Sequence, residues 1–276
     1  MKSEDAPLRS LAVSQRMMKS VAAAALFAGL VLMLPAQAET PAPTCETPLD
    51  LIRLANPLAH VAHKITVGEP ITVVAIGSSS TSGAGASSPA ANYPSRLAVE
   101  LQRHFPRLSI SVINRGVAGE EVADMLRRFD SAIVAVKPDL VLWQLGTNSV
   151  IRDHRLAGHD ALIVAGLAKI RSIGADVVLI DPQFAPKVIS KPQAEDMVTL
   201  ISATAKKENI DLFRRFEMMR HWRDADHVGF ETFVSPDGLH MNDWSYACMA
   251  KGLGDAIAEA AQRPILSATA ASHIIP

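Results

Sequence analysis

Two segments of this 276-residue chain carry residue types suited to nucleophilic chemistry. Directly after the apolar stretch 71–76 stands a serine-rich run, Gly77-Ser78-Ser79-Ser80-Thr81-Ser82-Gly83. A glycine there lets the backbone turn sharply and present a serine hydroxyl, which becomes a nucleophile when a base lies within reach. Serine and glycine runs are also typical of flexible linkers. The position of this run, between an apolar stretch and a helical pattern, favours the nucleophile.

The second segment, 236–242, offers a base and a partner for it. Asp237 precedes His240 by three residues across Gly238, and a carboxylate at that spacing can turn back to the imidazole Nδ1. Such a contact fixes the tautomer and orientation of a general base. The same sequence would also be found if the aspartate capped a helix and the histidine had an unrelated role.

Two more segments follow apolar runs and contain hydrogen-bond donors. They are Asn114-Arg115-Gly116-Val117-Ala118-Gly119 and Gly146-Thr147-Asn148-Ser149. Taken alone, each is an ordinary strand-to-helix turn. Backbone N–H groups and an asparagine amide are nevertheless the donors from which an oxyanion hole is built. The serine run fits neither a nucleotide-binding P-loop nor a Gly-x-Ser-x-Gly elbow, because it lacks a Gly-Lys-Ser/Thr ending and has Thr81 in place of the second glycine.

The elements that must position these segments alternate along the chain. Short runs rich in Val, Ile and Leu predict strands at 71–76, 110–113, 140–145, 177–180 and 210–213. Helical periodicity predicts helices at 49–63, 93–104, 122–136, 161–173, 191–208 and 242–261. This alternation predicts an α/β fold, a three-layer α/β/α sandwich around a mostly parallel five-stranded sheet. Parallel strands end at one edge, so loops from neighbouring strands meet there.

In this order and spacing, the four segments resemble the sequence blocks of the SGNH, or GDSL-type, hydrolase family, over about residues 71–248. The resemblance implies a flavodoxin-like sheet and a serine hydrolase mechanism. It implies Ser79 as nucleophile, His240 as general base and Asp237 as the residue that orients the base. The oxyanion hole would comprise the N–H groups of Ser79 and Gly119 and the side-chain amide of Asn148.

One residue departs from the family pattern. The family usually has Gly-Asp-Ser, and this chain has Gly77-Ser78-Ser79. Among the consecutive serines, the register Gly-x-Ser-x-Thr-x-Gly selects Ser79. Gly119 is selected over Gly116, which is assigned to the preceding turn.

The expected function is hydrolysis of acyl or acetyl esters, with acetylated envelope carbohydrate or peptidoglycan as candidate substrates. Short acyl esters, lysophospholipids and thioesters stay open, because a fold does not determine a substrate. An O-acyltransferase and a non-catalytic binding module on the same scaffold are the alternatives. No cofactor and no metal are expected. The pair His60 and His63 lacks a third ligand, and Asp224, Asp226 and His227 are typical of a solvated loop.

The ends of the chain predict export to the periplasm or the medium. Basic residues precede an apolar run at 21–34 and an Ala-Gln-Ala site ending at Ala38, which together predict a signal peptide at 1–38. That run is shorter than the roughly 20 residues of a spanning helix, so no membrane span is expected after cleavage. A linker and helix at 39–69, a hydrolase domain at 70–262 and a flexible tail at 263–276 complete the predicted organisation.

Composition and the remaining polar residues set further limits. A net charge of -1 and an aromatic content of 5% argue against nucleic-acid binding and leave a small-molecule or glycan ester as the expected partner. The sequence leaves open whether Cys45 and Cys248 pair in an oxidising compartment. It also leaves open whether Asp181-Pro182-Gln183 lines a substrate pocket or forms a plain loop. Trp143 is assigned to the core.

Overall fold

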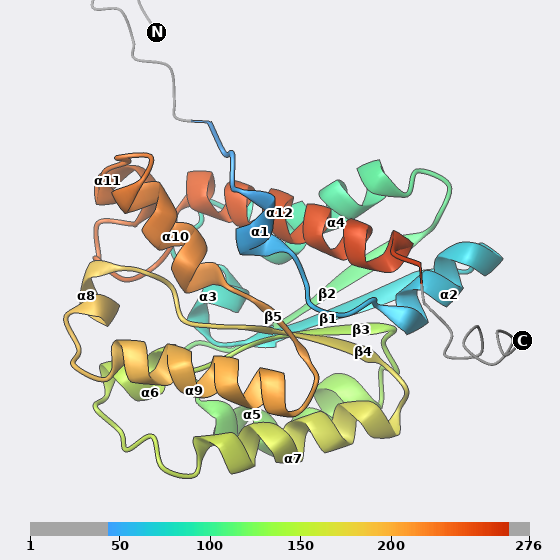
Figure 1. The fold of residues 1–276 in the computed structure, drawn as a ribbon, viewed down its shortest axis with the longest axis horizontal. Coiled ribbons are helices and arrows are strands. Elements are labelled where there is room, and N and C mark those ends of the chain that lie inside the picture. The colour runs from blue at the N-terminus through green and yellow to red at the C-terminus, as the bar shows by residue number, and fades with distance from the viewer. Residues whose placement is uncertain (1–43, 265–276) are drawn as a thin grey trace, which may run out of the picture. The chain divides into compact units, whose positions relative to one another are not determined.

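The computed structural model of the protein describes residues 44–264 (Figure 1). The predicted signal peptide at 1–38 lies outside the described residues, and so does the predicted tail beyond residue 264. In the described part, no helix combines the length and the apolar character that crossing a membrane requires.

A parallel sheet forms the centre of the fold. Its strands are β1 (Ile71–Gly77), β2 (Ile110–Gly116), β3 (Leu140–Gln144), β4 (Asp176–Ile180) and β5 (Asp211–Phe213). They lie in the order β2-β1-β3-β4-β5, and every pairing is parallel. The predicted five-stranded sheet is therefore confirmed, and it is fully rather than mostly parallel. Strand β3 is buried along its whole length, as its run of apolar residues requires.

Helices cover both faces of this sheet. Helices α4 (Tyr93–His104) and α12 (Asp243–Gln262) pack against each other over one face (Figure 1). Helices α5 (Val122–Arg127), α7 (His159–Ser172) and α9 (Ala194–Lys207) lie over the other. The remaining α-helices of the described part are α1 (Leu49–Ile52), α2 (Ala59–Val67), α3 (Ser79–Ser82), α6 (Thr147–Ile151), α8 (Pro186–Ile189), α10 (Arg215–Asp224) and α11 (Phe230–Phe233). The predicted three-layer sandwich is confirmed.

Two helices that were predicted as continuous are interrupted in the structure. The predicted helix at 49–63 is split into α1 and α2, because Pro57 removes a backbone donor and disfavours helical geometry at the residue before it. The predicted helix at 122–136 stops at Arg127, and a π turn follows at Asp130–Val134. The long closing helix begins as predicted, since Asn242 caps it by accepting the N–H of Ser245.

Aspartates at the amino ends of three strands hold the N-terminal segment. Asp139 accepts the N–H of Thr72 at 2.7 Å and contacts His60 Nε2 at 2.8 Å. Asp176 accepts the N–H of Val61 at 3.0 Å. Asp211 at the start of β5 accepts the N–H of Asn56 at 2.8 Å in the same way. Asp211 and Asp176 thus satisfy the N–H of Asn56, between α1 and α2, and that of Val61, in the first turn of α2 where no helical acceptor is available.

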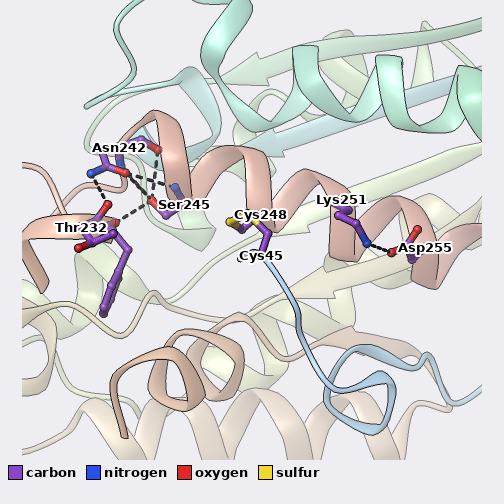
Figure 2. The surroundings of a disulfide bond; sticks show 8 residues. Cys45, Thr232, Asn242, Ser245, Cys248, Lys251 and Asp255 are labelled. Atoms are coloured by element: carbon purple, nitrogen blue, oxygen red, sulfur yellow. Dashed lines mark hydrogen bonds and ion pairs between the residues drawn. A yellow bond between two sulfur atoms is a disulfide. The ribbon is translucent and has the colours of Figure 1, made fainter. Parts of the chain in front are cut away.

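A disulfide ties the same segment to the last helix. Cys45 and Cys248 are bonded, with their Cα atoms 5.1 Å apart and a sequence separation of 203 residues. Figure 2 shows Cys45 against α12, between the Asn242–Ser245 cap and the Lys251–Asp255 ion pair. The structure therefore answers the question that the sequence leaves open about this pair.

Candidate active site

Ser79, His240 and Asp237 form a continuous chain of hydrogen bonds. Ser79 is the first residue of α3, and its Oγ lies 2.9 Å from His240 Nε2. His240 Nδ1 lies 2.5 Å from Asp237 Oδ2. Ser78 and Ser80 are buried, whereas Ser79 is partly accessible. Of the three consecutive serines, Ser79 is thus the one placed to react with a molecule from solvent.

The turn that carries the histidine is built around the Asp237 side chain. Asp237 Oδ1 accepts the N–H groups of Leu239 and His240, each at 2.9 Å, so that Oδ2 is left to face the imidazole. Partial burial acts to raise the pKa of Asp237, but these hydrogen bonds outweigh it and hold that pKa below its ordinary value. The carboxylate is therefore ionised at neutral pH and keeps the Nδ1–H tautomer of His240.

The segments after β2 and β3 contact each other at the carboxyl edge of the sheet. The side-chain amide of Asn148 donates to the carbonyl of Glu120 at 2.8 Å, which sets it against the loop that contains Gly119. Gly119 has φ +80°, a backbone conformation that side chains rarely adopt. Gly116, assigned from sequence to the preceding turn, is instead the last residue of β2.

The serine loop adjoins the same strand end. The side chain of Asn114 donates to the carbonyl of Thr81 at 2.8 Å and accepts the N–H of Gly116 at 2.8 Å. The N–H of Ser79 has no acceptor within α3, because the first residues of a helix lack one. The predicted donor residues Ser79, Gly119 and Asn148 thus come from three loops at the carboxyl edge of the sheet.

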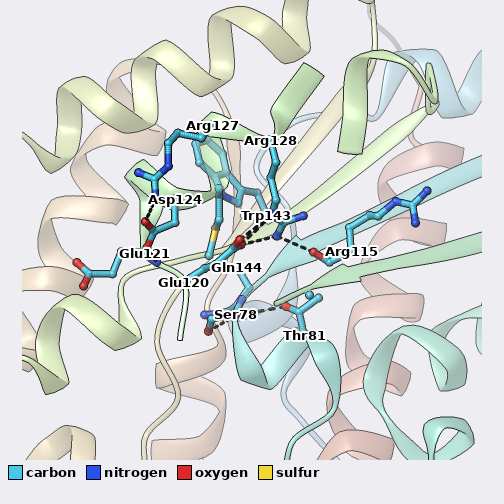
Figure 3. Close-up of polar contacts among 12 residues, drawn as sticks. Ser78, Thr81, Arg115, Glu120, Glu121, Asp124, Arg127, Arg128, Trp143 and Gln144 are labelled. Atoms are coloured by element: carbon cyan, nitrogen blue, oxygen red, sulfur yellow. Dashed lines mark hydrogen bonds and ion pairs between the residues drawn. The ribbon is translucent and has the colours of Figure 1, made fainter. Parts of the chain in front are cut away.

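Two acidic residues anchor the loop that contains Gly119. The carboxylate of Glu120 pairs with the guanidinium of Arg128, which also donates to the carbonyl of Arg115 at 2.8 Å (Figure 3). Glu121 pairs with Arg152 at 2.7 Å and accepts the hydroxyl of Ser149 at 2.8 Å. These ion pairs were not predicted from the sequence, because their partners are 8 and 31 residues apart along the chain.

Asp181 and Gln183 of the segment Asp181-Pro182-Gln183 are buried and make structural hydrogen bonds. Gln183 is buried, accepts the hydroxyl of Thr147 at 2.9 Å and donates to the carbonyl of Leu239 at 3.2 Å. It therefore links the residue before Asn148 to the residue before His240. The fully buried Arg215 donates to Gln183 Oε1 at 3.0 Å and to the carbonyl of Asp181 at 2.9 Å. Burial raises the pKa of Asp181 to about 7.

Two tryptophans belong to the hydrophobic core or pack against it. Trp143 is buried, and its indole N–H points at Met125 Sδ at 3.2 Å, as expected of a core residue. Trp244 packs edge-on against Trp222, with ring centroids 5.1 Å apart. Within residues 44–264 there is no group of three or more His, Cys, Asp or Glu side chains arranged to hold a metal ion.

Comparison with known proteins gives short or distant relatives. A curated acetylxylan esterase from Geobacillus stearothermophilus is 39% identical over 56 residues, which are 20% of this chain and 26% of that protein. The chain thus matches about a quarter of the length of that relative.

Solved structures share the fold. A two-domain esterase active on acetylated mannans has a TM-score of 0.68 at 18% identity, over 84% of this chain and 61% of that one. A lipolytic protein of the G-D-S-L family from Desulfitobacterium hafniense has a TM-score of 0.57 at 24% identity, over 67% and 98%. The acetylxylan esterase Axe2 from G. stearothermophilus has been solved as catalytic mutants in which a serine, a histidine or an aspartate is replaced by alanine. The structure of the histidine mutant has a TM-score of 0.58 at 18% identity, over 69% of this chain and 95% of that one.

The family assignment rests on most of the chain. The profile of the non-GDSL lipase-like family matches residues 44–263, nearly the whole described part. The fold of the solved structures agrees with it, and so does the order of the four sequence blocks. The chain belongs to the non-GDSL lipase-like family, and its predicted place among the SGNH, GDSL-type hydrolases is confirmed.

Proposed function

We propose that this protein hydrolyses carboxylic esters, with Ser79 as nucleophile, His240 as general base and Asp237 as the residue that orients the base. The observation that carries the proposal is the unbroken hydrogen-bond chain from the accessible Ser79 hydroxyl through the imidazole to an ionised carboxylate. A serine hydroxyl is a weak nucleophile unless a base takes its proton, and this arrangement supplies one.

The geometry supports a two-step mechanism. His240 Nε2 takes the proton from Ser79 Oγ as that oxygen attacks the carbonyl carbon of the ester. The N–H groups of Ser79 and Gly119 and the Asn148 amide donate to the carbonyl oxygen as it becomes negative. When the intermediate collapses, His240 gives the proton to the departing alcohol. Water then attacks the acyl-enzyme by the same route and releases the acid.

Acetylated carbohydrate is the substrate class that the proposal favours. Relatives described as acting on acetylated xylan and acetylated mannan support it. The openness of the site agrees with it, because the Asp237 side chain is 43% exposed and Ser79 is partly accessible. An acetyl group on a bulky sugar polymer can reach such a site without entering a tunnel.

Export is part of the proposal. The signal-peptide pattern ending at Ala38 supports it, and so does the Cys45–Cys248 disulfide, because disulfides persist in oxidising compartments and are rare in the cytosol. We therefore place the enzyme in the periplasm or the medium, where envelope and extracellular glycans are found.

Replacement of the nucleophile tests the proposal. We expect Ser79→Ala to lower kcat for acetate release from acetylated xylan by at least about a thousandfold. Asn148→Ala should lower it by about a hundredfold or more, through loss of one oxyanion donor. Free acetate is measured alongside acetyl transfer to an acceptor glycan, because a transferase would give the second product. Circular dichroism checks that both variants fold.

Covalent labelling distinguishes an enzyme from a binding module. A fluorophosphonate probe should label Ser79 in the wild-type protein at neutral pH and leave Ser79→Ala unlabelled. Wild-type activity in Ser79→Ala, or no labelling of the wild-type protein, would show that the proposed mechanism is wrong.

A further inference from the structure

A buried glutamine lies under the loop that carries the nucleophile. Gln144 is the last residue of β3 and is 1% exposed, in a strand whose other residues, Leu-Val-Leu-Trp, are all apolar. A buried amide is unfavourable unless its polar atoms are hydrogen-bonded. The hydrogen bonds of this side chain therefore explain why a glutamine occupies the end of a buried strand.

Within residues 44–264, the donors to the side-chain oxygen of Gln144 all come from the serine loop. It accepts the N–H of Ser78 at 2.9 Å, the hydroxyl of Ser78 at 3.1 Å and the hydroxyl of Thr81 at 3.3 Å (Figure 3). A backbone N–H can only donate, so the Ser78 N–H itself identifies the amide oxygen as the atom that faces the loop. Ser78 and Thr81 stand on either side of the nucleophile Ser79 in the sequence.

The loop is packed tightly around this oxygen. A Cβ atom on Gly77 would lie 2.2 Å from Thr81 Oγ1 and 2.7 Å from Gln144 Oε1, so the backbone approaches as closely as a glycine permits. The hydroxyl of Thr81 also contacts the Tyr93 hydroxyl at 3.1 Å. The buried side chains of Gln144 and Tyr93 thus hold α3 and the residue before it through hydrogen bonds. The Ser79 side chain remains in contact with His240.

We propose that Gln144 is a positioning residue for the nucleophile, matched to the serine at position 78. The inference rests on the proposed function and deepens it by assigning a role to the departure from Gly-Asp-Ser. Ser78 offers a hydroxyl donor to the amide oxygen of Gln144. An aspartate at position 78 would set a carboxylate against that oxygen, and two acceptors repel each other. The chain therefore uses a neutral donor–acceptor pair at this place.

Three variants test the role of the amide oxygen. Gln144→Met has a similar size and no acceptor, whereas Gln144→Glu keeps an acceptor for the same three donors. Ser80→Ala is the matched control, since the Ser80 hydroxyl is buried in the same loop without a hydrogen-bond partner. The measurements at pH 8 are kcat and KM for a small acetyl ester, the rate at which a fluorophosphonate labels Ser79, and the melting temperature.

The expected results separate positioning from packing. In Gln144→Met, kcat and the labelling rate should fall by about a hundredfold, the cost of a misplaced reacting group, while KM changes by less than about threefold. Gln144→Glu should recover most of both rates, and Ser80→Ala should behave like the wild-type protein. Ser78→Asp should lose activity in the wild-type background.

Specific outcomes would overturn the inference. Wild-type rates in Gln144→Met, or equal losses in the Met and Glu variants, would show that the amide oxygen does not position Ser79. Full activity in Ser78→Asp would show that the pair is not matched. A failure of the proposed function itself looks different, because Ser79→Ala would then keep its activity or the wild-type protein would not be labelled.

Discussion

At the scale of single residues, the carboxylate of Asp237 is the most exposed member of the proposed catalytic set. Its side chain is 43% exposed, while that of His240 is 17% exposed. Because folding lowers the pKa of Asp237, the ionised form stabilises the folded state above the ordinary aspartate pKa of about 3.9. That contribution is lost as the pH falls through the lower pKa of the folded state. The carboxylate should therefore stay charged throughout the pH range in which the enzyme works.

Replacement of Asp237 by asparagine tests this assignment. We expect Asp237→Asn to lower kcat by about ten-thousandfold with little change in fold, because the amide N–H₂ can hold the imidazole in the wrong tautomer. The check is kcat/KM between pH 5 and 9 for both proteins. In the wild-type protein, Asp237 should add no titration step to this profile. A loss of kcat smaller than about tenfold in Asp237→Asn would contradict the assignment.

Single residues also show where sequence reasoning stopped. Ser79, Asp237 and His240 were predicted, and the structure brings them together, because each stands in a short motif of recognisable spacing. Gln144 and Arg215 were missed. Gln144 stands between the buried Trp143 and Leu145, whereas Arg215 follows another arginine and gives no such signal. A residue such as Gln144 signals a buried polar contact, but its partner can be found only from the fold.

At the scale of elements, the contact between the end of β2 and the end of α3 leaves no room for a side chain. A Cβ atom on Gly116 would lie 2.1 Å from the backbone nitrogen of Ser82, and backbone atoms cannot move aside as a flexible side chain can. Gly252 in α12 provides the contrast, since a Cβ atom there would lie no closer than 3.5 Å to its neighbours. The same substitution should thus have opposite effects at the two positions.

Gly116→Ala and Gly252→Ala test this contrast. We expect Gly116→Ala to lower both the free energy of unfolding and kcat, because β2 or the nucleophile loop must shift. Gly252→Ala should raise the free energy of unfolding by up to about 1 kcal/mol, the difference in helix propensity, with kcat unchanged. Urea denaturation and ester hydrolysis measure both quantities. A Gly116→Ala variant as stable and active as the wild-type protein would contradict the close contact.

The elements also differ in how well they were predicted. Strands β1, β3 and β4 were found because short runs of Val, Ile and Leu, buried on both faces, are typical of the central strands of a parallel sheet. The single helix predicted at 49–63 was wrong. The helical spacing of apolar residues continues through Pro57, but the helical conformation of the backbone is interrupted there. The segment at 122–136 kept its apolar spacing but changed to a π turn after Arg127, which periodicity does not reveal.

At the scale of the whole molecule, the strand order places the chemistry. Strands β1, β2 and β3 are neighbours, so the loops that contain Ser79, Gly119 and Asn148 meet at one edge. His240 is delivered from the far end of the sequence by the turn before α12. The sequence predicted this meeting through a family resemblance, because strand order depends on packing between distant segments.

The disulfide gives a prediction for the whole chain. We expect the Cys45→Ser/Cys248→Ser double variant to lose up to about 5 kcal/mol of unfolding free energy, the chain-entropy value for a loop of this length. Its kcat should not change, because neither sulfur belongs to the Ser79–His240–Asp237 chain. Mass spectrometry of the exported protein should show a chain that begins at Glu39 and lacks two thiol hydrogens. Equal stability of both proteins, or a chain that still contains residues 1–38, would contradict these expectations.

The position of that disulfide also bears on when it can form. During synthesis Cys45 is made 203 residues before Cys248, and all the described strands lie between them. An oxidant that acts on a growing chain finds one cysteine and no partner for it. The bond can close only after Cys248 in the last helix has been made, because Cys45 and Cys248 are the two cysteines of the chain. The disulfide therefore cannot guide the folding of strands that form before Cys248 is made.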